Sequence, residues 1–168
     1  MPDIKHVESL VQAYITKNFK KPISIPILMP AIGPPIRVVV KDPDEIDFIQ
    51  LRAQGLNETF SEMLLRLIKE SGEKNSAVYT RANIDRRHFS KIANNPEYKP
   101  SKQTVLAFAI ALKLDFEKTE DLLAVAGFTL SKANLADVIV SFFIEYKIFD
   151  VDLVNQILYK YDQPLLGG

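Results

Sequence analysis

The 168-residue chain contains no cysteine, which excludes disulfide bonds and zinc sites built from cysteine thiolates. Its two histidines, His6 and His88, are too far apart in the sequence to have the spacing of a metal-ligand pair. The longest apolar run, VIVSFFI, is too short to span a bilayer, and no apolar N-terminal segment precedes a cleavage-like site. We therefore expect a cytoplasmic protein with no membrane segment, no cofactor and no metal.

The common catalytic patterns are absent as well. The sequence has neither a phosphate-binding P-loop nor a GxSxG nucleophile motif, and the glycine of AIGPP stands alone among prolines. The neighbouring acids Glu120 and Asp121 cannot face one substrate from two sides. We expect that the protein is not an enzyme.

The composition, 47% apolar and 25% charged, is that of a folded globular protein. The formal net charge is zero, but the charges are unevenly distributed along the chain. Residues 80–112 carry six basic and two acidic side chains, whereas residues 113–168 carry five basic and nine acidic ones. A basic centre followed by an acidic end can direct one part of a neutral protein towards a polyanion.

Residues 1–56 are interpreted as a small, Pro-rich, mixed α/β unit or arm. Helical spacing of apolar residues predicts a helix in DIKHVESLVQAYITKNF. The prolines between residues 22 and 35 exclude a helix there and leave two short extended runs, 23–29 and 36–41. The segment DPDEIDFIQLRAQG then predicts a helix capped by Asp42, with Pro43 in its first turn.

From residue 57 onwards the apolar spacing predicts a mostly α fold with seven helices joined by short loops. We assign residues 57–130 to a helical bundle and residues 131–168 to a C-terminal helical pair. LADVIVSFFIEYKIF is apolar on nearly all sides and must be buried all round, either against the bundle or in a subunit interface. The aromatic anchors of such a homodimer interface would be Phe142, Phe143, Tyr146, Phe149 and Tyr159.

The stretch VYTRANIDRRHFSKI, residues 78–92, places a very short turn between the second and third helices of the bundle. Ala82 and Asn83 occupy the turn, Ile84 follows as an apolar plug, and KPSKQTVLAFAIALKL supplies the next helix. This arrangement resembles the lambda-repressor-like (Xre-type) helix-turn-helix family over residues 60–128. The resemblance implies a five-helix helix-turn-helix bundle, with two extra C-terminal helices here, that binds double-stranded DNA through its third helix.

The outer face of the third helix supplies the candidate DNA contacts. With Ile84, Phe89 and Ile92 turned to the core, polar and cationic side chains remain outside. The residues expected to read bases are Arg86, Arg87, Ser90 and Lys91. The residues expected to contact phosphates, near the starts of the neighbouring helices, are Asn75, Ser76, Lys99 and Lys102.

A second likeness covers residues 63–166 and includes AGFTLS and DQPLLG. This region is similar to the C-terminal helical region of a group of uncharacterised bacterial proteins, some of which carry an ADP-ribose-binding macro domain. The sequence therefore leaves two hypotheses open. The first is a DNA-binding transcriptional or phage/defence-related regulator. The second is a non-enzymatic adaptor that keeps a degenerate helix-turn-helix fold and binds a protein partner in a bacterial signalling or defence system.

Overall fold

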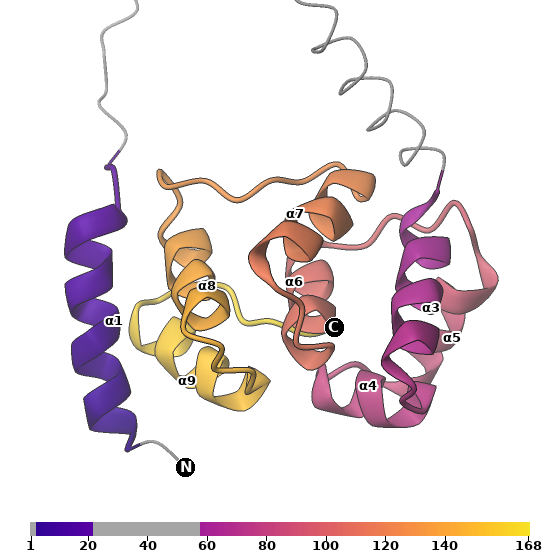
Figure 1. Ribbon diagram of the computed structural model, residues 1–168, viewed down its shortest axis with the longest axis horizontal. Coiled ribbons are helices and arrows are strands. Elements are labelled where there is room, and N and C mark those ends of the chain that lie inside the picture. The colour runs from indigo at the N-terminus through magenta and orange to yellow at the C-terminus, as the bar shows by residue number, and fades with distance from the viewer. Residues whose placement is uncertain (1–2, 22–57) are drawn as a thin grey trace, which may run out of the picture. The chain divides into compact units, whose positions relative to one another are not determined.

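The structure, a computed structural model, describes residues 3–21 and 58–168, which belong to one compact unit. This part of the chain contains eight α-helices and no β-strand, so the expectation of a mostly α fold is confirmed there (Figure 1). All seven helices predicted after residue 57 are present, as is the helix predicted near the N-terminus. The helices are α1 Ile4–Asn18, α3 Phe60–Ser71, α4 Asn75–Arg81, α5 Arg86–Asn94, α6 Lys102–Ala111, α7 Phe116–Val125, α8 Leu135–Glu145 and α9 Val151–Lys160.

The predictions for residues 22–56, namely the two extended runs and the helix that begins near Asp42, lie outside the described residues. None of the helices in the described ranges is both long enough and apolar enough to cross a membrane.

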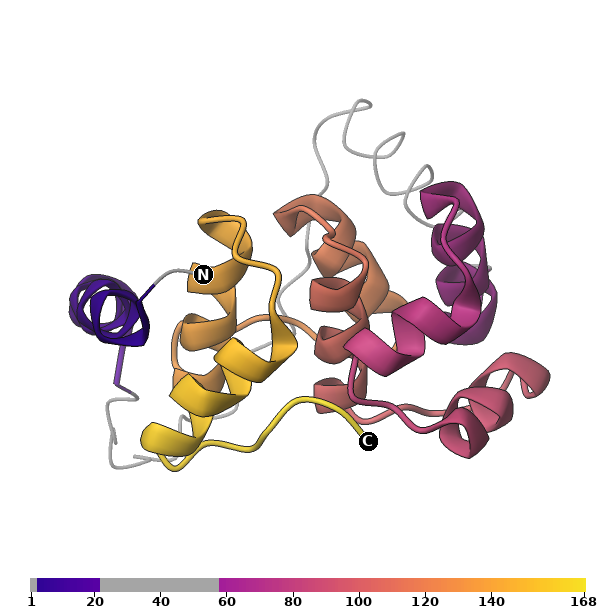
Figure 2. The same ribbon diagram turned by 90° about the horizontal axis from the view of Figure 1, so that it is seen from below.

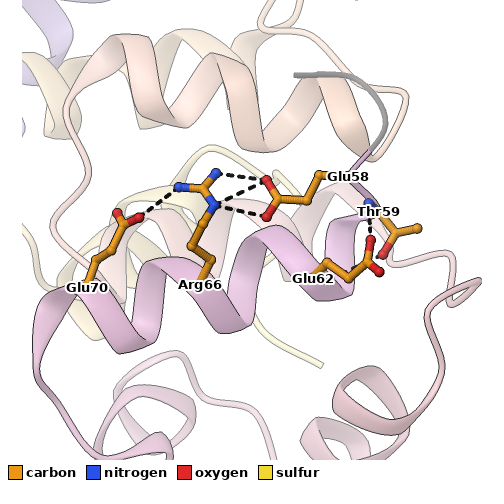
Figure 3. Close-up of polar contacts among 5 residues, drawn as sticks. All are labelled: Glu58, Thr59, Glu62, Arg66 and Glu70. Carbon is orange, nitrogen blue, oxygen red and sulfur yellow. Dashed lines mark hydrogen bonds and ion pairs between the residues drawn. The ribbon is translucent and has the colours of Figure 1, made fainter. Parts of the chain in front are cut away.

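The start of α3 shows how the local sequence sets a helix boundary (Figure 3). The Thr59 hydroxyl accepts the backbone N–H of Glu62, and the Glu62 carboxylate accepts the backbone N–H of Thr59 at 2.8 Å. The hydrogen bond from the Thr59 backbone holds the pKa of Glu62 below its usual value. The reciprocal hydrogen bonds of Thr59 and Glu62 satisfy two backbone donors that a helix start otherwise leaves without partners.

On the outer face of α3, Arg66 forms ion pairs with Glu58 at 2.8 Å and with Glu70 at 2.9 Å.

Helix α6 lies at the centre of the core. Every residue from Thr104 to Ala111 is buried, because α4, α7 and α9 pack around this helix. An apolar helix with no polar stripe must be covered on all sides. The need to cover α6 therefore brings helices from both predicted parts, 57–130 and 131–168, into one core.

Helix α1 packs on α8 and so belongs to the same unit as the C-terminal helices (Figure 1). It buries Val7, Val11 and Ile15, and the ring of Tyr14 meets the ring of Phe142 edge-on, with 5.4 Å between the centroids. The prediction of a separate N-terminal unit is corrected for residues 3–21, because the apolar stripe of α1 is covered by α8. The alternative, an arm, stays a prediction.

Helix α8 is buried on nearly all sides, as its composition predicted, but its partners lie within the same chain. It packs on α1, α7 and α9, and Phe142 and Phe143 are fully buried there. The prediction that these two residues anchor a subunit interface is therefore wrong, since no surface of either ring is left for a second subunit. Of the other predicted anchors, Phe149 is half-buried, whereas Tyr146 and Tyr159 are 54% and 76% exposed.

A buried ion pair joins the first turns of α6 and α8. The Lys102 ammonium lies 2.6 Å from Oδ2 of Asp137, whose side chain is buried. The same carboxylate oxygen accepts the backbone N–H of Ser131 at 2.9 Å, and the ammonium also donates to the carbonyl of Thr129 at 2.6 Å. The prediction that Lys102 contacts a phosphate is corrected accordingly, because its charge is directed into the protein.

We expect Asp137→Ala to lower the free energy of unfolding by about 3 kcal/mol, because it leaves the partly buried Lys102 ammonium without its carboxylate. The measurement is urea unfolding followed by circular dichroism. The control is Glu8→Ala, which breaks the more exposed pair with Lys160 and should cost less than about 1 kcal/mol. Equal losses in the two variants would contradict the role given to Asp137.

Candidate nucleic-acid interface

Helices α4 and α5 are joined by a tight turn over residues 82–85. Asn83 has a φ of +55°, a left-handed conformation that asparagine tolerates better than most residues. Ile84 follows as a buried plug, and its backbone N–H donates to the carbonyl of Tyr79 at 2.9 Å. Asp85 then caps α5 by accepting the backbone N–H of His88 at 2.8 Å. The turn and the plug therefore lie where the sequence placed them, and Asp85 begins the helix that follows.

Helix α5 has one apolar face, which packs on α3 and α4. Phe89 and Ile92 are buried, and the Phe89 ring lies 5.1 Å from the ring of Tyr79 and 6.2 Å from that of Phe108, centroid to centroid. Since the apolar residues occupy one side, the polar residues of the helix must lie on the other. The four residues predicted to read bases are all exposed: Arg86, Arg87, Ser90 and Lys91.

The cations of this face are not neutralised by the described part of the chain. None of the ion pairs within residues 3–21 and 58–168 involves Arg86, Arg87 or Lys91. Arg81, one helix earlier, is different, because its guanidinium binds both carboxylate oxygens of Glu73 and the carbonyl of Ala111. The hydrogen bonds between the two side chains raise the pKa of Arg81 and lower that of Glu73. Arg81 therefore fastens α4 in place, whereas the α5 cations face solvent.

The beginning of α4 and the outer side of α5 line one shallow hollow of about 650 Å³. Asn75 and Ser76 reach it from α4, while Arg86 and Ser90 reach it from α5. The structure thus brings two predicted phosphate contacts together with two predicted base readers. Lys99 is exposed in the loop that follows α5 and does not line this hollow.

Asn94 is an additional polar residue of the same hollow, and it is absent from the predicted DNA contacts. Its side-chain amide donates to the carbonyl of Ser90 at 2.8 Å and to the Ser90 hydroxyl at 3.1 Å. The signal was available in the sequence, because a residue four positions after Ser90 shares its helix face. An exposed carboxamide on this face can form two hydrogen bonds with an adenine edge.

His88 lies on the flank of α5 and is half-buried. Its Nε2 lies 2.7 Å from the Tyr98 hydroxyl, and the two rings are edge-on with their centroids 5.9 Å apart. This contact ties α5 to the loop that follows it, so His88 has a structural partner.

Within the described ranges, no three side chains of the metal-binding types lie close enough together to hold an ion. Comparisons of the chain with protein-family models, curated proteins and solved structures gave no match. The geometry and charge of α5 and its surroundings are therefore the features that indicate a function.

The Asp85 cap makes a prediction about acid stability. The backbone N–H of His88, with a smaller contribution from that of Arg87, lowers the pKa of Asp85 below its ordinary value of 3.8. A carboxyl group whose pKa is lower in the folded state stabilises the fold at pH values above its unfolded-state pKa. This stabilisation is lost as the pH falls through the folded-state pKa. Stability should therefore drop below about pH 4 in the wild type. In Asp85→Asn, whose amide oxygen still caps but cannot be protonated, this drop should be smaller.

The measurement is the urea midpoint at a series of pH values. Asp121→Asn, which removes an exposed carboxylate of α7, is the control and should follow the wild type. If the urea midpoints of Asp85→Asn and of the wild type fall equally as the pH is lowered, the cap is not a source of the pH dependence.

Proposed function

We propose that the protein binds double-stranded DNA through the outer face of α5, as a helix-turn-helix regulator of the lambda-repressor-like type. One observation carries the proposal. Helix α5 buries Phe89 and Ile92, while its exposed face carries Arg86, Arg87 and Lys91, none of them in an ion pair within the described residues. Burial of the apolar side fixes which side faces outward, and that outward side is cationic.

The dimensions of α5 suit the major groove. An α-helix with its side chains is about 10–12 Å in diameter, so the major groove of B-DNA, about 12 Å wide, admits one such helix. An arginine can donate two hydrogen bonds to the O6 and N7 atoms of guanine, which favours Arg86 and Arg87 as readers. Lys91 and Ser90 can hold a phosphate or a base edge, and Asn94 suits adenine.

Phosphate contacts on the flanks would set the register of α5 in the groove. Asn75 and Ser76 line the hollow beside Arg86, so a backbone phosphate at this hollow would meet side chains of both helices. Lys99 is exposed beyond the C-terminal end of α5 and would contact a phosphate on that side. With Lys102 withdrawn into its pair with Asp137, three of the four predicted phosphate contacts remain in the proposal.

The test is a titration of labelled random-sequence duplex with the wild type and the Arg86→Ala/Arg87→Ala double variant. We expect the variant to bind at least tenfold more weakly at low salt, because on random sequence Arg86 and Arg87 meet mainly phosphates and the variant removes both cations from that contact. The slope of log affinity against log salt should also become less steep, by roughly one for each phosphate that loses its cation.

The matched control is Lys5→Ala/Lys118→Ala, which removes two exposed cations from α1 and α7 and should bind like the wild type. Circular dichroism of all three proteins would verify equal helix content. If the wild type and the arginine variant bind the duplex equally poorly, the DNA-binding proposal is wrong.

A protein-docking adaptor is the second candidate function, and one observation favours it. Phe116, the first residue of α7, is 43% exposed and lines two neighbouring hollows. One of them is also lined by Leu67 of α3, and the other by Tyr14 of α1. An exposed aromatic ring beside such hollows is typical of a protein contact site. Absence of salt-dependent duplex binding in the titration would make the adaptor the leading proposal.

A further inference from the structure

A short segment after α9, here called the strap and defined as Pro164–Gly168, runs from the C-terminal helices to the turn between α4 and α5 (Figure 2). Its middle is clamped by Asn155 of α9. The Asn155 side chain accepts the backbone N–H of Leu166 at 2.7 Å and donates to the carbonyl of the same residue at 3.0 Å. The Leu166 side chain is buried in the core, so the strap is held by packing as well as by hydrogen bonds.

The glycines of the strap contact α6 and the turn between α4 and α5. The carbonyl of Gly167 accepts the hydroxyl of Thr104 at 3.2 Å, and the N–H of Gly168 donates to the carbonyl of Asn83 at 3.4 Å. Gly167 has a φ of +123°, and a Cβ atom there would lie 3.0 Å from the carbonyl oxygen of Asn83. A Cβ atom at Gly168 would overlap the imidazole of His88. The approach of the strap to α5 is therefore so close that only glycine fits without a shift.

Asn83 connects the same turn to α9 by a second route. Its side-chain amide donates to the Asp152 carboxylate at 2.8 Å, while its backbone carbonyl receives the N–H of Gly168. A glycine would adopt the φ of +55° more readily, but it would have no amide to reach α9. The turn that aims α5 is thus held to the C-terminal helices by one side chain and one backbone contact.

We propose that the strap and Asn83 are positioning elements for α5, so that α9 controls the orientation of the reading helix without touching DNA. The C-terminal end of α5 is already fixed, because Ser61 of α3 donates its hydroxyl to the carbonyl of Asn95. The N-terminal half of α5 carries Arg86 and Arg87. The strap supports this half, because Gly168 contacts the turn before α5 and lies against the imidazole of His88. The effect on DNA affinity rests on the proposed function, whereas the bracing of α5 does not.

The first test is hydrogen exchange of the backbone amides, measured by mass spectrometry on the full chain. In Gly167→Ala we expect the amides of α5 to exchange about tenfold faster, because displacement of the strap removes contacts from the turn and from His88. The control is Gly127→Ala, which also places alanine at a positive φ, +79°, but has nothing within 4 Å of the added Cβ. Its faster exchange should be confined to the end of α7.

Asn155→Ala provides a second variant, because it removes both clamping hydrogen bonds without changing the strap itself. It should also accelerate exchange in α5, while circular dichroism verifies that the helix content is retained. If neither Gly167→Ala nor Asn155→Ala changes α5 exchange relative to Gly127→Ala, the strap does not position α5 and the proposal is overturned.

The second test is duplex affinity, which separates failure of the strap from failure of DNA binding. We expect Gly167→Ala and Asn155→Ala to bind duplex about fivefold to tenfold more weakly than Gly127→Ala, although neither substitution removes a charge. Equal affinity of all three variants would overturn the control of DNA binding by the strap. A wild type that binds no duplex would overturn the proposed function, and the exchange experiment would still decide whether the strap braces α5.

Discussion

The fold depends on the burial of α6. This helix has no polar stripe between Thr104 and Ala111, so any side left facing water would expose apolar surface. Each Å² of exposed apolar surface costs about 25 cal/mol of folding free energy. Helices α4 and α7 cover part of it and α9 covers another part. Because α9 is needed to cover α6 completely, the C-terminal helices are part of the core. It also brings α9 near enough to the α4–α5 turn for Asp152 to bind Asn83.

The features that could be predicted from the sequence are those that neighbouring residues determine. Asp85, Ser101 and Asp115 are of the residue types that favour a helix start, and each accepts a backbone N–H from the first turn of α5, α6 or α7. The outward side of α5 was predictable for the same reason, because the spacing of Phe89 and Ile92 fixes the opposite face. Whether that face binds DNA is a question about a partner, and helix periodicity does not answer it.

The features that could not be predicted are those in which a residue has more than one possible partner far away in the sequence. The apolar character of Phe142 showed that it must be buried, but a covering helix and a second subunit satisfy that demand equally well. The structure provides the cover with Tyr14 of α1. Lys102 is a similar case, because a lysine beside a helix start suits a phosphate, and nothing local shows that Asp137 lies within 2.6 Å of it. In both cases the deciding residue is more than thirty positions away along the chain.

A net charge of zero is compatible with a polyanion site on α5, because charges act over short distances in salt solution. At physiological ionic strength the field of an exposed charge is screened over about 8 Å. The acids Glu117, Glu120 and Asp121 belong to α7, which packs on α3, α6 and α8, whereas α5 packs on α3 and α4. A duplex at α5 would therefore respond mainly to Arg86 and Arg87.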